Sequence, residues 1–142
     1  MIEHQPIEIL LLDDNKDDIL ATTTMLKDQK VDNIIHPFSS TVDALEFLRT
    51  RSVDVLFIDI NLGPKEDGNG LDFISKAREE QLIKDESVVV MSGVRDDRLE
   101  PRADLLGVSV WLTKPLNVQK LHHLVLSIPE FFIRVVKAYQ TN

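Results

Sequence analysis

The sequence contains no cysteine, which excludes disulfide bonds, thiolate metal sites and a cysteine nucleophile. Basic residues are also few, since 16 lysines and arginines stand against 24 aspartates and glutamates, for a formal net charge of -8. Because a nucleic-acid-binding surface needs an excess of positive charge, we expect no nucleic-acid partner. An acidic surface of this kind suits a divalent cation or a basic protein partner.

Long apolar runs are missing as well. No run is long enough to span a bilayer, and no basic-then-apolar leader opens the sequence, so we expect a cytoplasmic protein without a membrane partner. The 142 residues, of which 43% are hydrophobic and 28% charged, suit one globular domain with a sizeable core.

Five short apolar runs have the composition of strands that are buried inside a parallel sheet. They cover residues 7–12, 31–38, 53–61, 87–92 and 108–113. Apolar residues at helical spacing follow each run, so strands and helices alternate along the chain. This alternation predicts an α/β domain with a five-stranded parallel sheet and helices on both of its faces.

Local signals place the ends of several helices. Asn15 and Ser40 are expected to cap the helices that follow them. Residues 95–106 are predicted to form a helix with a narrow apolar stripe, with Pro101 in its first turn and Gly107 after its end. The expected apolar stripe of the last core helix consists of Val118, Leu121, Val125 and Ile128.

Polar residues follow the strands at positions that the fold should bring together. An acidic pair, Asp13 and Asp14, follows the first run, Asp59 lies in the third, Ser92 ends the fourth, and Lys114 follows the fifth. Right-handed crossovers place the carboxyl ends of parallel strands at one edge of the sheet. Each residue alone would more often be a turn residue, a helix cap or a solvated charge. Their joint placement favours a functional site.

The residue types at this edge suit phosphoryl transfer. Neighbouring strands lie about 4.8 Å apart, so carboxylates on adjacent strand ends can share one ion. Mg²⁺ is the expected cation, because it binds one or two carboxylates, keeps several waters and binds phosphate. A carboxylate can attack phosphorus and form an acyl phosphate. We therefore predict Asp59 as the nucleophile, with Lys114 and Ser92 stabilising the phosphoryl oxygens.

In combination, these residues resemble the receiver domains of bacterial two-component response regulators, including the chemotaxis regulator. The resemblance covers roughly Glu8 to Ile128. It implies a flavodoxin-like, doubly wound sheet with the strand order 2-1-3-4-5. The expected receiver domain spans residues 1–128. A capping-box pattern that begins at Ser127 predicts a short helical extension over residues 129–142, with an apolar face.

The resemblance also implies a role for each site residue. Asp59 is the expected phosphoacceptor, and the implied metal site consists of Asp13 through a water, Asp14, Asp59 and the backbone carbonyl of Asn61. Ser92 and Trp111 match the switch pair, and the bond between Lys114 and Pro115 is expected to be cis. Two features depart from the family pattern: the loop over residues 62–70 is a few residues longer, and Trp111 is bulkier than the usual tyrosine or phenylalanine.

These observations predict a stand-alone receiver, a signalling protein and not an enzyme. It would take a phosphoryl group from a histidine kinase or phosphotransfer protein in a Mg²⁺-dependent step and signal to a downstream protein through a surface change. The face of the fourth helix, fifth strand and fifth helix, or the C-terminal extension, would serve for homodimer formation. The sequence names neither the kinase nor the target.

Two other functions fit parts of the pattern. A Mg²⁺-dependent phosphohydrolase of the haloacid dehalogenase type would use an aspartate nucleophile, but it needs a second aspartate where this chain has Asn61. A receiver-like binding module would signal without phosphate. The intact set of Asp14, Asp59, Ser92 and Lys114 argues against such a module.

Overall fold

A computed structural model of the chain describes residues 6–28, 33–62, 69–93 and 96–128. Five parallel strands form one sheet in the order β2-β1-β3-β4-β5, which confirms the predicted flavodoxin-like order. The strands are β1 (Ile7–Leu12), β2 (Asn33–Phe38), β3 (Val55–Asp59), β4 (Ser87–Ser92) and β5 (Val110–Thr113). Their parallel pairing brings all five carboxyl ends to the same edge of the sheet.

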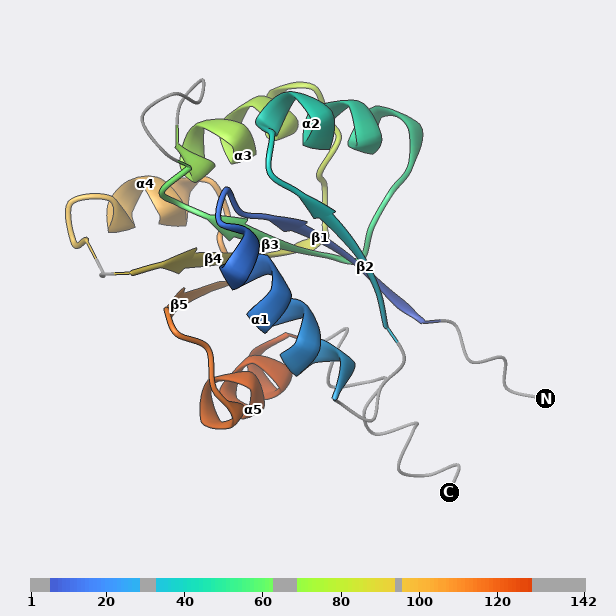
Figure 1. Ribbon diagram of the computed structural model, residues 1–142. Helices are drawn as coiled ribbons and strands as arrows, with labels where there is room; N and C mark the ends of the chain where they lie inside the picture. The colour runs from blue at the N-terminus through green and yellow to red at the C-terminus, as the bar shows by residue number, and fades with distance from the viewer. Residues whose placement is uncertain (1–5, 29–32, 63–68, 94–95, 129–142) are drawn as a thin grey trace.

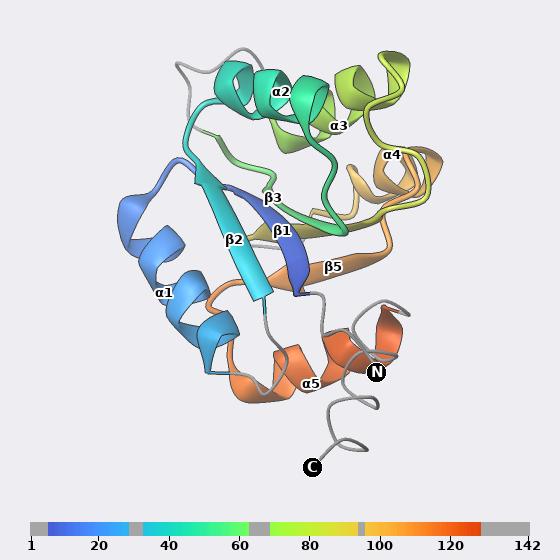
Figure 2. The same cartoon turned by 90° about the vertical axis from the view of Figure 1, so that its right-hand side faces the viewer.

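Helices cover both faces of the sheet, as predicted (Figures 1 and 2). On one face lie α2 (Thr41–Thr50), α3 (Gly70–Glu79) and α4 (Glu100–Leu105). On the other face lie α1 (Lys16–Lys27) and α5 (Val118–Ser127). The sheet is therefore the middle of three layers.

Side chains that alternate along each strand build a core on both faces of the sheet. On the side of α2 and α3 the core includes Leu10, Leu56 and Val90, and on the side of α1 and α5 it includes Phe57 and Val89. All five of these side chains are 0% exposed. This double burial fixes the central strands, so the residues at their ends have defined positions.

The first turns of the helices are held by the caps that the sequence predicts. The side chain of Asn15 accepts hydrogen bonds from the backbone N–H groups of Asp17 and Asp18. The Ser40 hydroxyl accepts from the N–H of Asp43, as expected. These bonds satisfy N–H groups that have no partner inside the helix. The cap at Asn15 fixes the start of α1 directly beside the end of β1.

Three predicted boundaries are wrong. Strand β3 is shorter than the predicted 53–61, and β5 is shorter than the predicted 108–113. The predicted helix over residues 95–106 is also too long, because α4 begins at Glu100. Ahead of it, the backbone N–H of Leu99 bonds to the carbonyl of Asp96, and the Asp96 carboxylate accepts from the N–H of Arg98, so this segment forms turns. Pro101 lies in the first turn of α4 and Gly107 follows it with φ 77°, as predicted.

Several predictions fall outside the residues that the structure describes. The helical extension over residues 129–142 and most of the loop over residues 62–70 are among them. Of the predicted stripe on α5, Ile128 is buried as expected, whereas the side chains of Val118, Leu121 and Val125 are not described. Within the described ranges, no helix is both long and apolar enough to cross a membrane.

Candidate functional site

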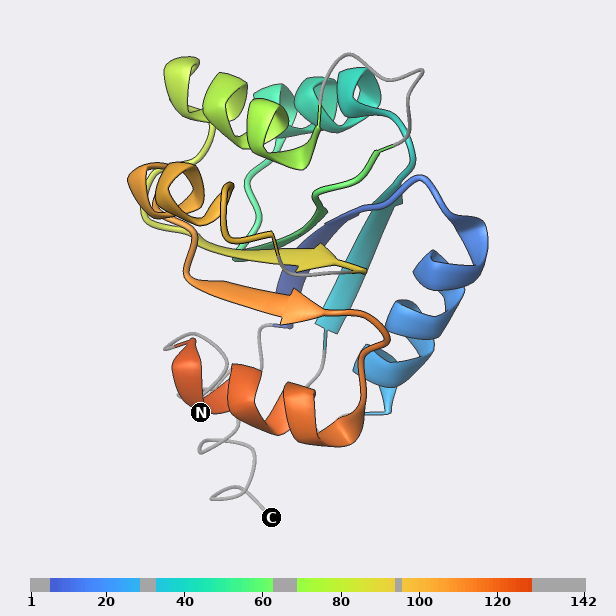
Figure 3. The same ribbon diagram turned by 90° about the vertical axis from the view of Figure 1, so that its left-hand side faces the viewer.

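The carboxyl edge of the sheet brings together the polar residues that the sequence predicts. The strands β4 and β5 end on the same side of the molecule (Figure 3). Leu12 pairs with Ile58, so Asp13, directly after β1, and Asp59, the last residue of β3, follow a matched pair of residues. Ser92 pairs with Thr113, and the N–H of Lys114 donates to the carbonyl of Ser92 at 2.8 Å.

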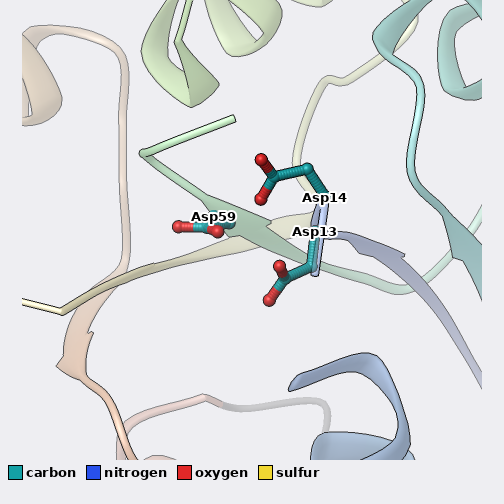
Figure 4. Close-up of side chains that lie close together, drawn as sticks. All are labelled: Asp13, Asp14 and Asp59. Carbon is teal, nitrogen blue, oxygen red and sulfur yellow. The ribbon is translucent and has the colours of Figure 1, made fainter. Parts of the chain in front are cut away.

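Three carboxylates gather at this edge (Figure 4). Asp13, Asp14 and Asp59 each offer an oxygen within 4.8 Å of the others. Asp13 is 0% and Asp59 4% exposed, whereas Asp14 is exposed. Backbone N–H groups hold the two buried ones: Asn15 donates to Asp13 at 2.9 Å and Asn61 to Asp59 at 3.1 Å. The cluster is thus fixed on its inner side and open to solvent at Asp14.

The ammonium group of Lys114 neutralises part of this charge. Its Nζ lies 2.7 Å from Asp13 Oδ2, 2.8 Å from Asp18 Oδ2 and 3.1 Å from Asp59 Oδ2. The sequence predicted the first and third of these neighbours, but it did not predict Asp18. The available signal was that the helix carrying Asp18 begins at the same edge of the sheet as the acidic pair.

Burial and charge shift the pKa values of both partners. Burial raises the pKa of Asp59 to about 6 from the ordinary 3.8, against the opposing charge of Lys114 and the hydrogen bond from Asn61. Asp13 adds to the rise because it is a nearby like charge. For Lys114, burial favours the neutral amine, but hydrogen bonds to Asp13 and Asp18 hold its pKa above the ordinary value. Lys114 therefore remains a cation, and the carboxyl of Asp59 ionises less readily than a free aspartate does.

These residues fit a hard divalent cation. The cluster offers carboxylate oxygens, the ligand type that Mg²⁺ binds, and Asp14 leaves the site open to metal-bound waters. Three carboxylates gather here around one ammonium group, so the ionised cluster carries more negative charge than Lys114 offsets. Asn61 lies two residues beyond Asp59 and is exposed at the same edge, next to the cluster.

The raised pKa predicts a pH-dependent effect of Asp59→Asn on stability when divalent cations are absent. In the folded state the pKa of Asp59 is about 6, above the ordinary 3.8, so the folded protein binds the Asp59 proton more tightly than the unfolded chain does. The free energy of unfolding therefore falls as the pH rises between these two values. Asparagine cannot ionise, so the variant should gain stability over the wild type above this range, by about 3 kcal/mol at most.

Urea unfolding of both proteins in EDTA, at about pH 4 and about pH 7.5, measures this difference. The free energies of unfolding of the two proteins should be nearly equal at the lower pH, and that of the variant should be larger at the higher pH. A wild type that is more stable than the variant at the higher pH would contradict the assigned cause.

The predicted switch residues are in direct contact. The indole Nε1–H of Trp111 donates to Ser92 Oγ at 3.1 Å. Ser92 is 1% exposed, and the half-buried Trp111 packs against the core on the side of α2 and α3. The bond between Lys114 and Pro115 is cis, as expected.

Helix α3 begins against the backbone of the central strand. The N–H of Gly70 donates to the carbonyl of Ile60 at 2.9 Å. A Cβ atom at Gly70 would clash with the carbonyl group of Asp59, so only glycine fits at this position. The Asn69 side chain caps α3, and the Asp72 carboxylate accepts from the N–H of Asn69. The start of α3 is thus tied to the end of β3.

Comparison with known proteins agrees with this geometry. The family model of the response regulator receiver domain matches residues 9–126. The chain is 25% identical over 138 residues to response regulator Rcp1 of Synechocystis sp., a match that covers 92% of each sequence.

Solved structures share the fold. The chemotaxis protein CheY4 of Vibrio cholerae superposes with a TM-score of 0.75 at 18% identity, over 87% of this chain and 99% of that one. The phosphorylated cyanobacterial phytochrome response regulator RcpA gives a TM-score of 0.73 at 24% identity, over 91% of this chain and 95% of that one.

Proposed function

The chain belongs to the response regulator receiver family, the signalling modules of two-component systems, and on that premise we propose that Asp59 is its phosphoacceptor. The phosphoryl donor is a phosphohistidine on a histidine kinase or phosphotransfer protein. The observation that carries this proposal is the ion pair between Lys114 and a buried carboxylate at the end of the central strand. We place the receiver within residues 1–128.

The transfer exchanges one bond to phosphorus for another. An Asp59 carboxylate oxygen attacks, and the bond that breaks joins phosphorus to the donor's imidazole nitrogen, which keeps the bonding pair. Lys114 lies 3.1 Å from Asp59 Oδ2, so its ammonium can donate to a phosphoryl oxygen on that carboxylate. Ser92, at the end of the next strand, is the second donor that we assign.

We assign the cation site to Asp13, Asp14, Asp59 and the backbone carbonyl of Asn61. The first three already offer oxygens within 4.8 Å of one another. When bound there, Mg²⁺ would neutralise the charge that accumulates as an anionic phosphodonor approaches. The backbone N–H of Asn15 donates to the carboxylate of Asp13 and so holds this ligand in place on the buried side of the proposed site.

The hydrogen bond between Ser92 and Trp111 supports a route from the phosphoryl group to the surface. A serine hydroxyl can donate one bond and accept others, so Ser92 can donate to the phosphoryl group while it still accepts from the indole. Movement of Ser92 would therefore pull on Trp111 and β5. Helix α4 is the neighbouring element, and its Leu105 is 88% exposed.

The sequence suggests that α4 shifts at low cost because it has few apolar anchors, but the structure adds polar ones. Arg102 of α4 bonds to Asp72 of α3 at 2.5 Å, and Arg78 of α3 donates to the carbonyl of Leu106 at 3.0 Å. A shift of α4 must therefore break these two contacts or move α3 together with α4. The face of α4, β5 and α5 and the extension over residues 129–142 remain our candidate surfaces for a dimer or a partner.

This route predicts the pattern of amide NMR shifts on binding of beryllofluoride, a phosphoryl mimic. We expect shifts at Ser92, Trp111 and α4 in addition to those at Asp14 and Asp59, because the serine–indole bond joins the two regions. In Trp111→Phe, which keeps an aromatic ring but lacks the N–H, the shifts in α4 should weaken. Shifts confined to Asp14, Asp59 and the loop over residues 62–70 would rule out this route.

Mass measurement after treatment with acetyl phosphate and Mg²⁺ tests the function itself. A receiver should carry one stable phosphoryl group per chain. Release of phosphate without an adduct would favour the phosphohydrolase, for which Asn61 is a poor general acid because its amide does not titrate. A chain that neither gains nor releases phosphate would favour a binding module.

A further inference from the structure

Among the described residues, Asp18 is the one carboxylate bound to Lys114 to which the proposed phosphoryl transfer assigns no role. It lies in the first turn of α1, where it would ordinarily only favour the helix dipole. Its Oδ2 lies 2.8 Å from Lys114 Nζ, as close as the buried Asp13 at 2.7 Å. A lysine ammonium has three N–H donors, and here three carboxylates lie within bonding distance. The donors of Lys114 are therefore fully used before any phosphoryl group arrives.

The three partners differ in how readily they can give up Lys114. Asp13 is 0% exposed, so loss of its cation would leave a buried charge without its partner. The side chain of Asp18 is 42% exposed, and it lines an open groove of about 310 Å³ together with Lys114 and Leu116. Water can replace lysine at Asp18 at low cost. Asp18 is thus a replaceable partner that competes for the ammonium.

We propose that Asp18 is a positioning residue that draws Lys114 towards α1 and so weakens its hold on a phosphoryl group at Asp59. The proposal rests on the function proposed above. While Asp13 and Asp18 both stay bonded to Lys114, only the N–H that now donates to Asp59 can turn to the phosphoryl oxygens. The carboxylate of Asp18 also adds a negative charge close to a group that is itself an anion. Both effects lower the stability of the phosphorylated state.

The variant Asp18→Asn removes this charge and leaves a weaker, neutral acceptor. In saturating Mg²⁺, we expect it to bind beryllofluoride about three- to tenfold more tightly than the wild type, the size of one partly exposed charge interaction. Fluorine NMR of the bound beryllofluoride measures this affinity without depending on any change of conformation. Asp18→Glu, which restores a carboxylate on the same helix turn, should return the affinity towards the wild-type value.

Asp17→Asn is the matched control. Asp17 is the adjacent residue, is exposed, and also lies in the first turn of α1, so its replacement changes the net charge and the dipole interaction equally. Among the described residues, Lys114 pairs with Asp18 and not with Asp17. Thermal unfolding of each variant separates a change in affinity from a loss of fold.

The outcomes distinguish the proposal from its premise. Tighter binding in Asp18→Asn, with Asp17→Asn unchanged, supports the proposal. Equal or weaker binding in Asp18→Asn, or the same gain in Asp17→Asn, overturns it while leaving the phosphoacceptor assignment in place. A folded wild type that binds no beryllofluoride overturns that assignment, and the proposal with it.

Discussion

Asp59→Asn should abolish phosphorylation by acetyl phosphate while the domain stays folded. Asp59 is 4% exposed, ends the central strand, and has one oxygen 3.1 Å from the Lys114 ammonium. An amide has the same shape and can accept the hydrogen bond from the N–H of Asn61, but it does not attack phosphorus as a carboxylate does. Mass spectrometry after treatment should therefore show only unmodified chain.

Asp54→Asn is the control for this loss, because Asp54 directly precedes β3 and so lies at the end of the strand opposite to Asp59. Its carboxylate accepts from the backbone N–H of Glu8 at 2.8 Å, a bond that an asparagine oxygen can also accept. We expect normal phosphorylation of this variant. Full labelling of Asp59→Asn would show that another residue is the phosphoacceptor.

The residues whose convergence the sequence predicts share one property: each lies at, or directly after, the end of a strand that can be recognised from its apolar composition. Asp13, Asp59 and Lys114 are such residues, and parallel pairing alone brings them together. The order of the strands in the sheet cannot be predicted in this way, because the alternation of strands and helices along the chain does not determine which strands are neighbours. The family resemblance supplied that order.

Asp18 could not be found in the same way. Its bond to Lys114 joins residues 96 positions apart, and its place in a helix first turn already had a local explanation. The start of α4 was misplaced for a related reason. The turns ahead of it depend on the Asp96 carboxylate, and apolar spacing carries no information about that hydrogen bond.

Removal of divalent cations should stop phosphoryl transfer to the wild-type chain. Carboxylate oxygens of Asp13, Asp14 and Asp59 lie within 4.8 Å of one another. Asp18 is also bonded to Lys114, and the one positive charge of Lys114 cannot offset the charges of all four carboxylates. An anionic phosphodonor is repelled by that excess charge unless a cation joins the site. Excess EDTA should leave the chain unlabelled by acetyl phosphate, and added Mg²⁺ should restore the labelling.

The exposed member of the cluster allows a sharper test of where the cation binds. Asp14→Asn removes one carboxylate of the proposed cation site without burying a new group, so it should raise the Kd for Mg²⁺ roughly tenfold or more. Asp17→Asn removes the same charge outside the cluster and should change the Kd far less, because exposed charges are screened. Titration of the Trp111 fluorescence with Mg²⁺ measures both values, since the indole is bonded to Ser92 at the same edge of the sheet. Labelling that persists undiminished in EDTA would show that phosphoryl transfer needs no divalent cation. Equal effects of the two variants on the Kd would show that the cation does not bind at this carboxylate cluster.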